Sequence, residues 1–229
     1  MDPEPQELPE EAVTVGRWLL VGALTGVEVA TLSVWLALVG GAEPFSRPIA
    51  VSVVVLCAGL QVEHFLTDLA VNGADIGFPL GQTLVVSISE AALWFGWLTL
   101  AASMGGLRGI FVSGVAFAVL LSIQHTVETN ALGHRPLDAR LFEPATVGFS
   151  LITAAGATAW LALTAPVAGT GSFARFIGSL GLDPGAFGFT LLFFAVVAER
   201  VMVVRLARQN RSSTTVPYRH RYASNIRIR

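Results

Sequence analysis

The sequence predicts an all-α, polytopic membrane bundle of six transmembrane helices with a rhodopsin-like arrangement. Hydrophobic residues make up 53% of the 229 residues and charged residues only 13%, and the mean hydropathy is +0.66. Soluble domains carry about 25% charged residues, so this composition excludes that class. Six apolar stretches approach the roughly 20 residues that a helix needs to cross a bilayer. They are residues 15–39, 49–70, 82–103, 109–129, 145–165 and 186–207.

Segments of different composition separate these spans. Glycine, proline or charged residues interrupt the apolar pattern, which is typical of turns and loops. The connecting segments are residues 40–48, 72–81, 104–108, 130–144 and 166–184. The chain therefore divides into an acidic N-terminal segment (1–14), a six-helix transmembrane domain (15–207) and an Arg-rich tail (208–229) that is too short and too charged to be a further span.

Arginines near the span ends predict the orientation of the chain. All fourteen basic residues are arginines, and the cytoplasmic side of a membrane protein holds the excess of basic residues. The side shared by both termini holds seven, namely Arg17, Arg135, Arg140, Arg208, Arg211, Arg219 and Arg221. The other side holds three, namely Arg47, Arg108 and Arg175. We therefore expect a multi-pass protein of the cell membrane with both termini in the cytoplasm.

Several function classes have no support in the sequence. The single cysteine, Cys57, excludes a disulfide framework and a cysteine metal site within the chain. The catalytic and phosphate-binding motifs G-x-S-x-G and H-E-x-x-H and a phosphate-binding glycine loop are missing, so we expect no enzyme. The expected partners are membrane lipid, a protein on the cytoplasmic face and a second copy of the chain, and nucleic acid is not among them.

Ionisable residues within the spans are the candidate functional residues. Such groups cost free energy in a membrane unless they are paired or hydrated, so they often mark functional sites. The spans contain Glu28, Glu63, His64, Glu90, His125 and Glu128. Glu28 lies near mid-span, whereas the others are displaced toward the predicted cytoplasmic side. If their helices adjoin, these groups form one polar cavity open to the cytoplasm.

This set of residues is compatible with several kinds of site. His64 and Asp68 are four residues apart and His125 and Glu128 are three apart, so each pair shares a helix face and can bind metal or relay protons. The pattern departs from the Glu-x-x-His motifs of di-iron bundles, and we therefore predict no metal site. His64 and His125 could instead be the axial ligands of a b-type haem. A structural alternative is that these polar groups hydrogen-bond one another and hold the helices in register.

A weak internal repeat places a tryptophan seven residues after an acidic or polar residue in three of the spans. Glu28 precedes Trp35, Glu90 precedes Trp97, and Thr153 precedes Trp160, in each case by seven residues. Seven residues return to nearly the same face of a helix. We interpret the tryptophans as anchors near the outer membrane interface.

The order of these segments resembles the heliorhodopsins, a divergent family of microbial rhodopsins whose N-terminus faces the cytoplasm. The stretch Leu60–Leu66 is similar to the family's segment with a cytoplasmic-cavity histidine, here His64. Ser87–Ala92 is similar to the segment with the counterion of the retinal Schiff base, which implies this role for Glu90. His125–Glu128, followed by Leu141–Pro144, is similar in spacing and places Glu128 on a family glutamate.

The resemblance covers roughly residues 50–206 and departs from the family in one chemically important respect. Retinal attaches to a lysine of the seventh helix, and this chain contains no lysine. The family's long first extracellular loop is also reduced. Residues 218–223 are similar to the polar approach to a seventh helix, which leaves open whether the chain is cut short before one. Without a Schiff-base cation, Glu90 must be neutralised or find another partner, such as Arg200.

The sequence therefore predicts a heliorhodopsin-like membrane protein with a sensory or partner-binding, non-transporting role. Its site residues are Glu90, His64, Glu128 and His125, and no cofactor is expected because retinal has no lysine to bind. The alternative is a small electron-transfer or ion- and proton-handling membrane subunit that holds haem b or a metal.

Overall fold

The computed structural model describes residues 10–39, 42–43, 45–72, 80–133, 135–164 and 171–214. Every regular element within these ranges is a helix. The helices are α1 (Glu10–Val39), α2 (Arg47–Asn72), α3 (Leu80–Met104), α4 (Gly106–Leu132), α5 (Pro144–Thr164), α6 (Gly171–Ser179) and α7 (Pro184–Thr214). Residues 1–9 and 215–229, which hold most of the acidic segment and the end of the Arg-rich tail, lie outside the described residues.

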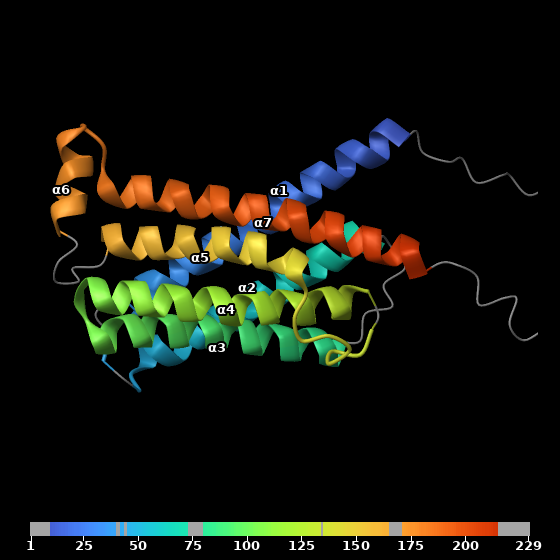
Figure 1. The fold of residues 1–229 in the computed structure, drawn as a ribbon, viewed down its shortest axis with the longest axis horizontal. Helices are drawn as coiled ribbons and strands as arrows, with labels where there is room; N and C mark the ends of the chain where they lie inside the picture. Colours follow the sequence, from blue (N-terminus) through green and yellow to red (C-terminus); the bar gives the residue numbers. More distant parts are fainter. Residues whose placement is uncertain are drawn as a thin grey trace, which may run out of the picture.

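Six of the described helices are long and apolar enough to cross a membrane, which confirms the prediction of a polytopic helical bundle. Their spans are Trp18–Val39, Arg47–Asn72, Gly81–Met104, Gly106–Leu132, Pro144–Thr164 and Pro184–Leu206. The most extensive contacts join α5 with α7, α1 with α2, α3 with α4, and α4 with α5. The first residues of α1 and the last residues of α7 lie at the same end of the bundle (Figure 1). We call this end the terminal side and the other end the opposite side.

Two helical segments differ from the sequence-based expectation. The connection expected as a loop over residues 166–184 contains the short helix α6, which lies across the opposite side of the bundle (Figure 1). Its Ile177 is buried while Phe173 and Phe176 are exposed, as in a helix that lies along a membrane interface. Helix α7 continues through Thr214, past the expected start of the tail at 208. Good helix formers such as Ala207 and Arg208 follow the span, and the next proline is Pro217.

Small residues allow close approach of the helices at several points. Gly105 and Gly106 have positive φ values of 63° and 58°, which allow the tight turn between α3 and α4. A Cβ atom on Gly156 would lie 2.6 Å from Cβ of Ala195, so α5 and α7 pack nearly backbone to backbone there. Small residues at helix contacts are typical of membrane bundles, in which packing replaces much of the hydrophobic driving force.

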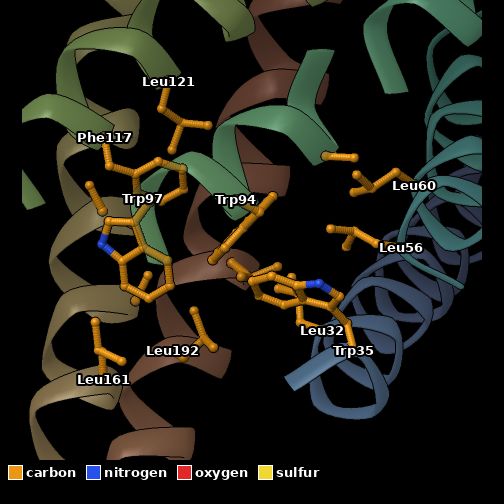
Figure 2. Close-up of a cluster of buried hydrophobic side chains, with 14 of the residues drawn as sticks. Leu32, Trp35, Leu56, Leu60, Trp94, Trp97, Phe117, Leu121, Leu161 and Leu192 are labelled. Atoms are coloured by element: carbon orange, nitrogen blue, oxygen red, sulfur yellow. The ribbon is translucent and has the colours of Figure 1, made fainter. Parts of the chain in front are cut away.

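The interior of the opposite half is apolar and rich in aromatic rings (Figure 2). Trp94 lies at its middle, with its ring centroid 6.2 Å from that of Trp35, 5.6 Å from that of Trp97 and 4.8 Å from that of Phe117. Leucines of α1, α2, α4, α5 and α7 surround these four rings, which we call the aromatic layer. The prediction of interface anchors is therefore wrong for Trp35 and Trp97, which are 0% and 3% exposed.

Candidate functional site

Eight ionisable side chains meet inside the bundle and form what we call the charged centre. Each is at most 2% exposed. Its members are Glu28 of α1, Glu63 and His64 of α2, Glu90 of α3, His125 and Glu128 of α4, and Glu199 and Arg200 of α7. The structure thus brings together all six residues singled out in the sequence. They form a closed centre rather than the expected open cavity.

Arg200 connects α7 to three other helices. Its Nε donates to Oε2 of Glu28 at 2.7 Å, and its Nη1 lies 3.1 Å from Oε1 of both Glu63 and Glu128. Nη2 is 3.4 Å from Oε1 of the neighbouring Glu199. A guanidinium presents five donors in a planar fork, which suits it to contact several carboxylates at once. Arg200 therefore joins α7 to α1, α2 and α4 from a fully buried position.

His64 faces the carboxylates of α3 and α4. Its Nδ1 lies 2.6 Å from the carbonyl oxygen of Leu60, and because a carbonyl only accepts, Nδ1 carries the proton. The other ring nitrogen, Nε2, is 3.4 Å from Oε2 of Glu90 and 3.8 Å from Oε1 of Glu128. Glu90, the expected counterion, therefore lies beside His64, whereas the four other glutamates of the charged centre form ion pairs with Arg200.

His125 belongs to a second group of contacts on α5 and α7. Ser150 donates to the carbonyl oxygen of Thr146, so its hydroxyl oxygen is available to accept from Nδ1 of His125 at 2.7 Å. Nε2 of His125 lies 3.1 Å from Oε1 of Glu199, whose other oxygen accepts from the Thr153 hydroxyl. Both ring nitrogens of His125 thus face protein groups.

The seven-residue repeat places its polar residues at the charged centre and its tryptophans in the apolar interior. Glu28 and Glu90 lie in the charged centre, and Thr153 binds Glu199 in the same centre. Seven residues later, Trp35 and Trp97 lie in the aromatic layer, and Trp160 packs against the same apolar cluster. Seven residues of helix rise about 10 Å, so the repeat separates a polar level of the bundle from an apolar one.

Negative charge exceeds positive charge in the charged centre. Five carboxyl groups share it with one guanidinium and two imidazoles. Even with both histidines protonated, five ionised carboxylates would leave two uncompensated negative charges. An isolated buried carboxylate costs several kcal/mol, so such an excess is not sustained without bound cations or protons. The centre must therefore hold additional positive charge.

Outside the charged centre, most buried polar residues lie toward the terminal side, whereas Thr31, Ser52 and Ser113 lie toward the opposite side. Helices α2, α3, α4 and α5 carry the set on the terminal side, which consists of Thr67, Asp68, Asn72, Thr83, Ser87, Thr126, Thr129, Asn130, Thr146 and Ser150. On the opposite side, the buried hydroxyls of Ser52 and Ser113 donate to carbonyl oxygens of their own helices. Within the described residues, polar groups therefore lead from the centre to one end of the bundle, and the aromatic layer closes the other.

The sequence did not single out Glu199, and it suggested Arg200 only as a partner of Glu90, whereas the ion pairs of Arg200 are with Glu28, Glu63, Glu128 and Glu199. Glu199 and Arg200 both lie within the sixth apolar stretch, which was the signal available to find them. The same-helix pairs that the spacing suggested are not the main contacts of His125 and Glu128. His125 pairs with Glu199, and Glu128 lies between Arg200 and His64.

Comparisons of the chain with protein-family models, with curated proteins and with solved structures find no match. The structural finding is a polytopic membrane bundle with a buried charged centre, and the resemblance to heliorhodopsins stays a prediction.

Proposed function

We propose that this chain is a non-transporting, sensory membrane protein whose charged centre takes up a cation from the cytoplasmic side. One observation carries the proposal: five buried carboxyl groups share the charged centre with one guanidinium and two imidazoles, and Arg200 contacts only four of the five. Because this excess of negative charge requires neutralisation, the state of the centre depends on the cations that reach it.

Arg200 supplies a physical link between cation uptake and helix packing. A cation bound at the other oxygens of Glu63 and Glu128 would draw negative charge from the same carboxylates that Arg200 contacts at 3.1 Å, and so weaken those contacts. Weaker contacts there would loosen α7 from α2 and α4. Since α7 extends beyond its span to Thr214, a change in its packing reaches the surface on the terminal side. A protein partner that binds this end of α7 would receive the signal.

The asymmetry of the interior supports a sensory role over transport. A transport path needs polar groups or water on both sides of the binding site, because an ion in a dry apolar environment is costly. Polar side chains lead from the charged centre toward the terminal side, whereas Trp94, Trp97 and Phe117 fill the interior on the opposite side. The arginine distribution predicts that the terminal side is cytoplasmic.

The surroundings of the histidines favour a small cation over a haem. Nδ1 of His125 faces Ser150 and Nε2 faces Glu199, so this ring offers no free nitrogen to a haem iron. Arg200 also lies among α1, α2, α4 and α7, in contact with the carboxylates of Glu28, Glu63 and Glu128. The absence of lysine argues against covalent retinal.

Two measurements on the full chain test the proposal. Hydrogen exchange of α7 in nanodiscs would report its packing as pH and added metal ions are varied, with Arg200→Gln as a variant and Glu143→Gln as a control. Glu143 is a suitable control because it lies outside the charged centre. Its carboxylate forms an ion pair with Arg140, whose side chain is largely exposed. We expect cation-dependent exchange in the wild type and the control, and cation-independent exchange in Arg200→Gln. Flux assays in proteoliposomes should show no cation transport. Cation flux above that of empty liposomes, or exchange that no cation alters, would contradict the proposal.

A further inference from the structure

We propose that Glu63, His64 and Glu90, with Glu128 as a fourth ligand, form a binding site for a divalent transition-metal ion of the zinc class. This inference rests on the proposed function, because it names the cation that the charged centre takes up. One ligand atom from each of Glu63, His64 and Glu90 can be chosen so that the three lie within 4.8 Å of one another. The ligands come from α2, α3 and α4, so the metal would tie these three helices together.

The hydrogen bond of His64 orients it as a metal ligand. Nδ1 donates to the carbonyl oxygen of Leu60, which leaves the lone pair of neutral His64 on Nε2. Histidines that bind metals typically donate their other ring N–H to a carbonyl or carboxylate, which fixes the tautomer and the ring orientation. Nε2 faces the carboxyl groups of Glu90 at 3.4 Å and Glu128 at 3.8 Å.

Each of the four proposed ligand residues has a buried atom without a hydrogen-bond partner. Oε2 of Glu63, Nε2 of His64, Oε2 of Glu90 and Oε2 of Glu128 are all buried without a hydrogen-bond partner. A buried polar atom that is left unsatisfied is costly, and more so when it is charged, so these four atoms on neighbouring residues require an explanation. A metal ion would accept the lone pairs of all four.

Arg200 leaves one oxygen of each neighbouring carboxylate available. Oε1 of Glu63 contacts Arg200 and accepts from Thr67, while Oε2 of the same carboxylate accepts no hydrogen bond and lies 3.4 Å from Nδ1 of His64. Glu128 shows the same division, with Oε1 beside Arg200 and Oε2 unpartnered. The guanidinium therefore orients both carboxylates and does not occupy the atoms that would bind the metal.

The donor set and spacing select the class of metal. One imidazole nitrogen with carboxylate oxygens suits Zn²⁺ and its first-row neighbours, whereas Mg²⁺ and Ca²⁺ prefer oxygen ligands alone. With bonds of about 2.1 Å, two ligand atoms of a tetrahedral site stand about 3.4 Å apart. Nε2 of His64 is 3.4 Å from Oε2 of Glu90, and it is 3.8 Å from Oε1 of Glu128, the oxygen that contacts Arg200. A side-chain adjustment that turns Oε2 of Glu128 toward Nε2 would complete the site, and the ion would supply two positive charges to a centre with excess negative charge.

The test uses the full chain without an affinity tag, stripped of metal with a chelator and held in nanodiscs. Co²⁺ is the probe, because it replaces Zn²⁺ in such sites and its visible absorption reports the ligand geometry. We expect one Co²⁺ per chain, displacement of Co²⁺ by Zn²⁺, and no displacement by Mg²⁺ or Ca²⁺. His64→Gln and Glu90→Gln should each weaken binding on the order of 100-fold, and the control Glu143→Gln should bind like the wild type.

Two results would overturn the inference. One is a wild-type chain that binds neither Co²⁺ nor Zn²⁺, and the other is binding that both ligand variants retain, since the metal would then lie elsewhere. Glu90→Gln preserves side-chain shape, so it keeps the test decisive if His64→Gln does not fold. Hydrogen exchange of α7 that still responds to pH in a chain without metal affinity would refute the metal site and leave the proposed function standing.

Discussion

The Nε atom of Arg200 lies 2.7 Å from Oε2 of Glu28, although the two residues are 172 positions apart in the chain. This contact joins α7 to α1, the last described span to the first. Both side chains are at most 1% exposed, so the pair is screened from solvent. Arg200 therefore closes the bundle around the charged centre, and its removal should affect the whole fold.

Replacing Arg200 by Gln should destabilise the protein strongly. The variant leaves four glutamates without their cation, and breaking a buried ion pair by removing one partner costs about 3–5 kcal/mol. Thermal unfolding in one detergent measures this loss. Arg205→Gln is a matched control, because Arg205 lies on the same helix and is exposed. Equal melting temperatures of the two variants would contradict the role assigned to Arg200.

The close approach of α5 and α7 predicts a second stability effect. Gly156→Val should destabilise the bundle by about 1–3 kcal/mol, because the new side chain would overlap Ala195. Gly148→Val on the same helix should have a smaller effect, since a Cβ there meets no atom within 4 Å. Melting curves of both variants test the packing. If Gly148→Val is the more damaging change, the close contact is not as described.

The aromatic layer should act as the barrier to ions on the opposite side. Replacing both Trp94 and Trp97 by Ala removes two buried rings and should allow water to reach the charged centre. We expect a cation leak in proteoliposomes that the wild type lacks, together with a lower melting temperature. The exposed Phe111→Ala serves as a control, because its ring is 72% exposed and does not belong to the layer. An unchanged cation permeability in a folded double variant would show that the layer is not the barrier.

The orientation of the chain is tested by reporter fusions. Reporters that mature only outside the cytoplasm should stay inactive at Asp2 and Arg229 and become active when inserted at Gly181 on the opposite side. The expectation follows from the excess of arginine on the side shared by the termini. Activity at a terminal fusion would reverse the orientation and place the buried polar residues of the terminal side toward the outside of the cell.

The spans were predictable because membrane helices are defined by local composition. The stretch predicted at 145–165 is helix α5, Pro144–Thr164, and the stretch at 49–70 lies within α2, Arg47–Asn72. Helix α6 escaped prediction because nine residues between glycine-rich ends give too short a pattern. The seven-residue repeat indicated which residues share a helix face, but not whether that face points inward or toward lipid.

The contacts of the charged centre could not be read from the sequence. Spacing along one helix shows which residues share a face, as for His125 and Glu128, but the pairing of His125 with Glu199 depends on how α4 and α7 pack. The position of Arg200 within the sixth apolar stretch distinguishes it from the tail arginines, but the carboxylates that it contacts depend on tertiary packing. The sequence did predict that the six candidates lie together if their helices adjoin, because an ionisable residue within a membrane span is stabilised by a polar partner.

The most direct test of the central claim compares Glu90→Gln with Glu28→Gln in metal-free protein at neutral pH. If the charged centre carries more carboxylate than its cations balance, Glu90→Gln removes surplus charge and should melt at or above the wild-type temperature. Glu28→Gln removes the closest partner of Arg200 and should melt well below it, because a buried ion pair is broken. A Glu90→Gln variant that melts as far below the wild type as Glu28→Gln would show that Glu90 is a required, paired carboxylate, and would contradict the claim that the centre awaits a cation.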